Sequence, residues 1–242
     1  MQRFELQSYD GILAFGAVLA GVYAKLGWEN RVWTWHEAAD TTVFYPRSAE
    51  RVDADIVWIG NWGDEERTSE IEEFLLRPAE QLGITATLFG VRYPQQAIQS
   101  VSARGFRYRG WLANHLVPEA FARHRMTIHV PRRPYAERLR GIPTIRVFEA
   151  LACGVPLVSA PWTDSENLFP AGCFLMARNS AEMKKHLRAL LHDAALAAAL
   201  KEKGLAVIRE RHSCRHRVTE LLAICALIRG ESSVRNRKSE AA

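Results

Sequence analysis

The sequence lacks the usual features of a secreted, membrane-spanning or nucleic-acid-binding protein. No apolar run approaches the length of a transmembrane helix, and the first ten residues contain no apolar signal-peptide core. A net charge of +5 is too small to indicate a nucleic-acid partner, although it suits an anionic ligand such as a nucleoside diphosphate. The cysteines form neither a CxxC pair nor a regular framework, which favours reduced thiols in a cytoplasmic protein: Cys153, Cys173, Cys214 and Cys225.

The pattern that is present is an alternation of short apolar strands and amphipathic helices. The 242 residues, 48% of them hydrophobic, suffice for one large or two small globular domains. From Ala54 onward this alternation predicts an α/β fold, a doubly wound, Rossmann-like parallel sheet with helices on both faces. The expected strands cover 55–60, 84–89, 106–108, 126–130, 155–160 and 174–177. The expected helices cover 68–82, 94–103, 118–124 and 144–152, followed by three C-terminal helices at 180–192, 194–211 and 215–229.

The segment from Gly141 to Trp162, GIPTIRVFEALACGVPLVSAPW, carries the most functional information. We expect Thr144 to begin a short helix, Gly154 to end it, and a buried strand to follow. Glu149 falls beside the apolar stripe of that helix. A carboxylate so close to a packed face needs an ion-pair partner or a ligand hydroxyl.

This segment resembles the donor-sugar motif of GT-B glycosyltransferases. The resemblance is strongest to the CgeB-like (spore-protein-like) group, whose "T.R.FEA.ACG.PL" core is matched by Thr144, Arg146, Phe148-Glu149-Ala150, Ala152-Cys153-Gly154 and Pro156-Leu157. It implies that Glu149 binds the ribose hydroxyls of a nucleotide. Many retaining GT-B enzymes have two glutamates in an E-x7-E pattern, whereas here the first would fall on Gly141.

The resemblance implies a glycosyltransferase that moves a sugar from a nucleoside-diphosphate donor to an unknown acceptor, without a metal or other cofactor. A complete GT-B enzyme has two Rossmann-like domains. We therefore expect residues 1–50 to be a remnant of the N-terminal domain plus the interdomain connection, and residues 51–229 to be the nucleotide-sugar-binding domain. Residues 230–242 are polar and are predicted to be disordered. On this reading the chain is truncated, and a partner chain or the missing N-terminal domain would complete it.

Ligands of doubly wound sheets bind at the C-terminal ends of the strands, so the loops there supply the candidate site residues. Glycines permit close backbone approach, and arginines bind phosphate bidentately. The alternatives are an ordinary surface turn at 60–67 and a structural role for Arg92. The predicted ligands of the nucleotide and its phosphates are Gly60, Asn61, Gly63, Arg67, Arg92, Arg132, Arg133, Thr144, Arg146 and Glu149.

His36 is the catalytic candidate because it lies on the predicted interdomain connection and would face the cleft. A hydrogen-bonded structural histidine is the alternative. His36-Glu37-Ala38-Ala39-Asp40 lacks the second histidine of an HExxH zinc site, which excludes metalloprotease chemistry. His212 and His216 stand among arginines that would repel a cation. We therefore predict no metal site.

Two other functions fit the same sequence. One is a non-catalytic nucleotide-sugar-binding fragment, with the apolar face of residues 11–35 as its docking surface. The other is a nucleotide-sugar epimerase of the same architecture, although the acidic and histidine residues it would need cannot be placed here.

Overall fold

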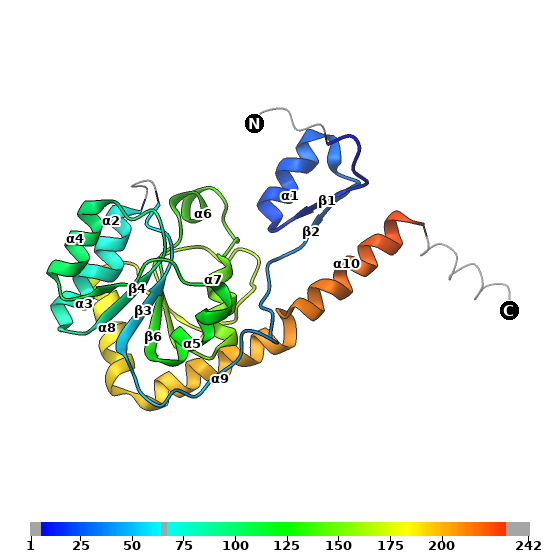
Figure 1. Ribbon diagram of the computed structural model, residues 1–242. Coiled ribbons are helices and arrows are strands. Elements are labelled where there is room, and N and C mark those ends of the chain that lie inside the picture. The colour runs from blue at the N-terminus through cyan, green and yellow to red at the C-terminus, as the bar shows by residue number, and fades with distance from the viewer. Residues whose placement is uncertain (1–5, 64–66, 231–242) are drawn as a thin grey trace.

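The computed structural model describes residues 6–63 and 67–230, and its centre is a six-stranded, fully parallel sheet (Figure 1). The spatial order is β5-β4-β3-β6-β7-β8, so the chain moves outward from β3 in one direction and then returns to the other side of β3. This is the doubly wound order, and it confirms the predicted fold class. The strands are β3 (Ala54–Ile59), β4 (Ala86–Phe89), β5 (Arg107–Tyr108), β6 (His124–His129), β7 (Leu157–Ser159) and β8 (Leu175–Met176).

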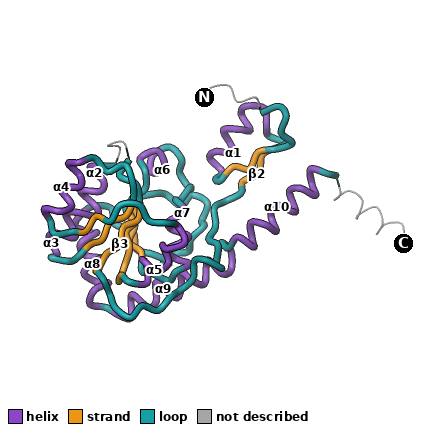
Figure 2. The backbone as a smooth tube through the Cα atoms, viewed as in Figure 1, coloured by secondary structure: helices purple, strands orange, loops and turns teal. Residues whose placement is uncertain are grey.

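Helices cover both faces of this sheet, and each face has its own apolar cluster (Figure 2). Neighbouring residues of one strand point to opposite faces, so Ile56 packs in one cluster and Val57 in the other. The first face is covered by α2 (Thr68–Ile71), η2 (Glu72–Leu76), α3 (Arg77–Leu82), α4 (Gln95–Ala103) and α8 (Ser180–His192). The second face is covered by α5 (Val117–Ala122), α7 (Ile145–Ala152) and α9 (Ala194–Arg211).

The N-terminal unit, residues 9–35, forms a separate small layer. Strands β1 (Ile12–Ala14) and β2 (Val32–Thr34) pair in parallel in their own two-stranded sheet. Between these strands lie α1 (Ala17–Tyr23) and η1 (Ala24–Trp28), which includes Gly27 at a left-handed φ of 91°. The last helix, α10 (Cys214–Ile228), projects from the main sheet on the side of this unit (Figure 1).

Two local predictions were wrong. His124 begins strand β6, whereas the sequence indicated the end of a helix. The segment expected to be a loop around Arg133 contains the short helix α6 (Arg133–Glu137). Pro134 explains the helix, because proline suits the first helical turn, where its missing N–H costs nothing. A 3-10 turn, η3 (Asn114–Leu116), precedes α5.

Other expectations have mixed outcomes. None of the helices in 6–63 and 67–230 is long and apolar enough to cross a membrane. The four cysteines are free thiols. The predicted tail lies outside the described residues from 231 onward, and the boundaries after residues 50 and 229 stay predictions.

Candidate functional site

Arg67 joins the two loops at the point where the strand order reverses, between β3 and β6. Its side chain is buried, and its Nη1 donates to the carbonyl of Val130 at 2.9 Å. Its other terminal nitrogen donates to the carbonyl of Asn61. Arg67 therefore holds the β3 and β6 loops together at the crevice where doubly wound sheets bind ligands.

The β3 and β4 loops approach each other so closely that glycine is required. A Cβ at Gly90 would lie 2.0 Å from the carbonyl oxygen of Gly60. The Asn61 side chain accepts from the amide of Val91 at 3.1 Å, so the asparagine braces the β3 loop against the β4 loop. Gly63 adopts a φ of 84°. Residues 64–66, whose carboxylates would repel a phosphate, lie outside the described residues.

The arginines beyond β4 and β6 are at the surface. Arg92 is exposed, with a left-handed φ of 58°. Arg132 is the N-cap of α6, and Arg133 is its first residue. The Nη2 of Arg133 lies 2.8 Å from Oε1 of Glu70. Although burial raises the pKa of Glu70, its hydrogen bonds with Arg133 bring that pKa below its usual value.

Glu149 lies in α7 with its side chain only 4% exposed. Thr144 is the N-cap residue of this helix, as predicted, with an extended φ of −82°, although its side chain makes no capping bond. Arg146, one turn before Glu149, forms an ion pair with it, and Asn114 donates to its Oε1 at 3.5 Å. Burial raises the pKa of Glu149 despite the opposing charge of Arg146. A buried carboxylate of this kind gains from any further hydrogen-bond donor.

Glu37 is a site residue that the sequence reasoning missed. Its Oε2 is buried and has no hydrogen-bond partner among the described residues. Burial, followed by the nearby charge of Glu149, raises the pKa of Glu37 to about 7. Its position directly after His36 was the only signal in the sequence. Near neutral pH the pair Glu37 and Glu149 thus carries less than two negative charges.

His36 contacts a second residue that the sequence reasoning missed, Glu166 in the loop after β7. The His36 Nε2 lies 2.7 Å from Glu166 Oε2, and the other carboxylate oxygen accepts from the amide of Ala17 at 2.8 Å. The side chains of His36 and Glu166 are 19% and 14% exposed. The Glu166 carboxylate therefore binds both His36, in the segment that follows β2, and the β1–α1 turn.

The β1–α1 turn packs directly on the loop that precedes α7. A Cβ at Gly16 would lie 2.3 Å from Cγ1 of Ile142. At Gly141, where the first glutamate of the E-x7-E pattern is missing, a Cβ would lie 3.0 Å from Oε1 of Glu166. A carboxylate thus stands beside position 141, supplied from another loop.

The structure brings some predicted residues together and keeps others apart. Arg146 pairs with Glu149, and Arg67 bonds Asn61, but Arg133 pairs with Glu70 of α2. In the described part of the chain, no group of three or more His, Cys, Asp or Glu side chains is placed to hold a metal ion. His212 has its Nε2 2.8 Å from the carbonyl of Leu168.

Several solved structures share the fold of this chain. HepE from Anabaena, in complex with UDP-glucose, matches with a TM-score of 0.66 and 16% identity over 91% of this chain and 64% of its own. Sucrose-phosphate synthase from Thermosynechococcus elongatus matches with a TM-score of 0.66 and 15% identity over 98% of this chain and 60% of its own. T4 phage BGT, in complex with UDP and Mn²⁺, matches with a TM-score of 0.59 and 16% identity over 76% of this chain and 49% of its own. The chain therefore spans about two thirds or less of each of these proteins.

A search of curated proteins found no match. The family comparison is direct evidence, because residues 67–223 match the model described as glycosyl transferase-like. That stretch includes β4 to β8 and the Glu149 helix. The chain belongs to this glycosyl transferase-like family.

Proposed function

We propose that this chain binds a nucleoside-diphosphate sugar at the C-terminal ends of β3, β6 and β7 and contributes the donor half of a GT-B glycosyltransferase. The buried Glu149 carboxylate carries this proposal. It lies one turn inside α7, whose N-terminus faces the crevice, and it is held by Arg146 and Asn114. Family membership supports the same reading.

Each part of the crevice suits one part of a donor. Glu149 would accept hydrogen bonds from the ribose hydroxyls. The free amides at the start of α7, beside Thr144, would bind diphosphate oxygens together with the helix dipole. Arg132 and Arg133 add positive charge at the β6 loop. The proposed catalysis uses no metal ion, because these groups would neutralise the leaving diphosphate.

The glycine turn would let the donor approach the β3 loop. Gly60 and Gly63 carry no side chain that would block it, and Asn61 and Arg67 hold the loop in place. Arg92, at the end of β4, extends the row of cations along the strand ends. These assignments rest on the position of the loops, which is where such sheets bind nucleotides.

The transfer step would also need side chains from the N-terminal part of the chain, on the side that faces this crevice. In the proposed reaction His36 lies at the boundary of the two parts, oriented by Glu166. CgeB-like membership, and completion by an N-terminal domain or partner chain, belong to the same proposal. A non-catalytic nucleotide-sugar-binding protein is the second candidate.

The first test is calorimetric titration of the 242-residue chain with UDP and UDP-glucose. These are the ligands of HepE, and other nucleoside diphosphates complete the panel. Saturable binding is expected. Glu149→Gln should weaken it about 10- to 100-fold, because a hydrogen bond to a charged group contributes about 1.5–3 kcal/mol.

Glu182→Gln is the matched control. Glu182 also pairs with an arginine, Arg178, but on the exposed surface of α8. This variant should bind the nucleotide as tightly as the parent. Unchanged affinity for Glu149→Gln, with an unaltered melting temperature, would refute the ribose assignment. A chain that binds the donor is then tested for sugar transfer to added acceptors. Transfer supports the glycosyltransferase, and its absence supports the non-catalytic binding protein.

A further inference from the structure

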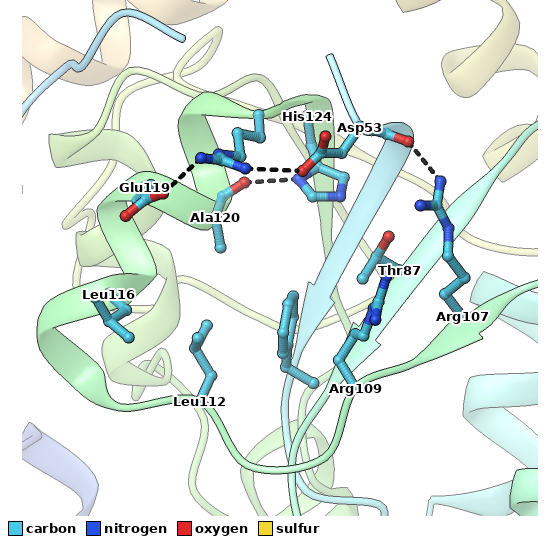
Figure 3. A pocket seen from close by; sticks show the side chains of 11 residues that line it. Asp53, Thr87, Arg107, Arg109, Leu112, Leu116, Glu119, Ala120 and His124 are labelled. Atoms are coloured by element: carbon cyan, nitrogen blue, oxygen red, sulfur yellow. Dashed lines mark hydrogen bonds and ion pairs between the residues drawn. The ribbon is translucent and has the colours of Figure 1, made fainter. Parts of the chain in front are cut away.

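A second cavity lies along the edge of the sheet, where the outer strands are not covered by a helix. On the second face, α5 and α7 pack over β3, β6 and β7. Strands β4 and β5 are bordered on that face only by α5 and by the loop that follows β5. The resulting cavity has a volume of about 210 Å³ (Figure 3). None of the predicted nucleotide ligands lines it.

The alternation of the outer strands sends polar side chains into this cavity. Leu88 and Tyr108 point into the opposite apolar cluster, so Thr87 and Arg107, which are register partners, face the cavity. Arg109 follows two residues later and faces the same side. Figure 3 shows the guanidinium of Arg109 beside Thr87.

Thr87 is only 5% exposed, and its hydroxyl, which makes no hydrogen bond to the described residues, opens to the cavity. Since Thr87 lines the cavity, its hydroxyl is available to a ligand bound there.

The positive charges beside Thr87 are also not balanced by carboxylates. Arg107 donates to a neutral backbone carbonyl, that of Asp53, at 2.6 Å. Arg109 has no ion pair among the described residues. The carboxylates of the cavity are both engaged with another arginine, because Arg123 lies 3.5 Å from Asp53 Oδ2 and 2.8 Å from Glu119 Oε1 (Figure 3). Two like charges two residues apart on one strand face repel each other, and an anion between them would remove that cost.

We propose that this cavity binds a phosphate monoester through Arg107, Arg109 and Thr87. Two guanidinium groups and a hydroxyl offer several donors from one side, which suits a tetrahedral oxyanion. Phe89, which lies beside Thr87 on the same face of β4, and Leu112 and Leu116 give the cavity an apolar lining as well, so the ligand also carries a carbon skeleton. The small volume favours a compact ligand such as a sugar phosphate over a nucleotide sugar.

The loop after β5 connects this cavity to the candidate donor crevice. Arg109 and Leu112 belong to the segment that leads into Asn114, and Asn114 contacts both Glu149 and Arg146. This connection does not carry the proposal, which concerns binding and stands independently of the donor assignment.

The test is calorimetric titration of the 242-residue chain with glucose 6-phosphate, with inorganic phosphate, and with vesicles containing phosphatidic acid, in a phosphate-free buffer. Saturable binding of glucose 6-phosphate is expected, with inorganic phosphate weaker because it lacks the carbon skeleton. Arg109→Gln should weaken binding at least tenfold. Thr87→Val should weaken it severalfold without lowering the melting temperature, because the hydroxyl makes no hydrogen bond to the described residues that could be lost.

Arg209→Gln is the control, since Arg209 is an exposed residue of α9 outside the cavity and its loss changes the net charge equally. It should leave the affinity within twofold of the parent. Equal losses of affinity for glucose 6-phosphate in Arg109→Gln and Arg209→Gln would overturn the proposal. So would the failure of both glucose 6-phosphate and inorganic phosphate to bind, including the case in which only the vesicles bind. Displacement of glucose 6-phosphate by UDP, with UDP affinity lowered by Arg109→Gln but not by Glu149→Gln, would also overturn it. That result would make the cavity the nucleotide site.

Discussion

The main sheet and the N-terminal unit are built from the same kinds of element but differ in how much they bury. In the main sheet, Ile56 and Val57 of the central strand are both 0% exposed, because helices cover both faces. In the N-terminal unit, Leu13 is 37% and Leu26 59% exposed. A two-stranded sheet with one short helix cannot cover its own faces. The main sheet is therefore a self-sufficient core, whereas the N-terminal unit depends on contacts outside itself.

The contacts that hold the N-terminal unit are few and mostly polar. Glu166 binds the amide of Ala17 and the ring of His36, and Trp35 donates from Nε1 to the carbonyl of Arg217 in α10 at 2.9 Å. Helix α10 also exposes apolar residues, with Leu222 64% exposed. The comparison predicts that substitutions have large effects in the sheet and local effects in the unit.

The largest effect should come from truncating a core side chain. Leu88→Ala in β4 removes a fully buried side chain and should lower the free energy of unfolding by about 2–5 kcal/mol. Leu222→Ala makes the same chemical change on the exposed face of α10 and should cost less than about 0.5 kcal/mol. Urea denaturation measures both. Similar losses would show that α10 is buried in solution and would remove the contrast between the two regions.

The next effect concerns Glu37, in the connection between the regions. Its folded pKa of about 7 exceeds the ordinary glutamate value of 4.5, so the folded state holds the proton more tightly. The resulting stability is fully present below about pH 4.5 and is lost as the pH rises through about 7. Glu37→Gln should match the parent at acidic pH and exceed it at pH 8 by on the order of 2–3 kcal/mol.

Denaturation of the Glu37→Gln variant across this pH range provides the measurement. Glu210→Gln, an exposed change on α9, should follow the parent at every pH. If the free energies of unfolding of the parent and Glu37→Gln changed in parallel with pH, Glu37 would be solvated and its pKa would not be raised by folding.

The smallest effect should come from Glu166, and it should be confined to the N-terminal unit. Glu166→Ala removes the acceptor of two hydrogen bonds and should cost about 1–3 kcal/mol of local stability. Hydrogen exchange should rise in residues 12–34 and stay unchanged in β3 and β6. Uniformly faster exchange across both regions would show that they unfold as one unit.

The sequence was sufficient to predict most of the fold. Helices 180–192 and 194–211 have the predicted bounds, because Asn179 and Asp193 are N-caps whose side chains accept from the helix amides. The fully buried strand β3 was recognisable because both of its faces are apolar. Helix α6 was missed because two arginines and a proline in a row are also typical of a loop.

The candidate site was only partly predictable. Glu149 stood out because its motif is local: the carboxylate, the helix and the following glycine turn lie within one short segment. Glu37 and Glu166 did not stand out, because, apart from the position of Glu37 directly after His36, nothing in their local sequence distinguishes them from surface glutamates. Arg67 was predicted as a phosphate ligand, and the fold shows in addition that it bridges two loops.

The amino-acid sequence by itself determined the order of strands and helices, the doubly wound class and the helix that carries Glu149, because periodicity, caps and glycine turns act over a few residues. Only the tertiary structure decided which carboxylates meet. Glu37 and Glu149 are 112 positions apart, as the sequence numbering shows, and His36 and Glu166 are 130 apart. Their ionisation and hydrogen bonding depend on burial and on neighbours supplied by distant segments, and those are fixed when the sheet and its covering helices pack.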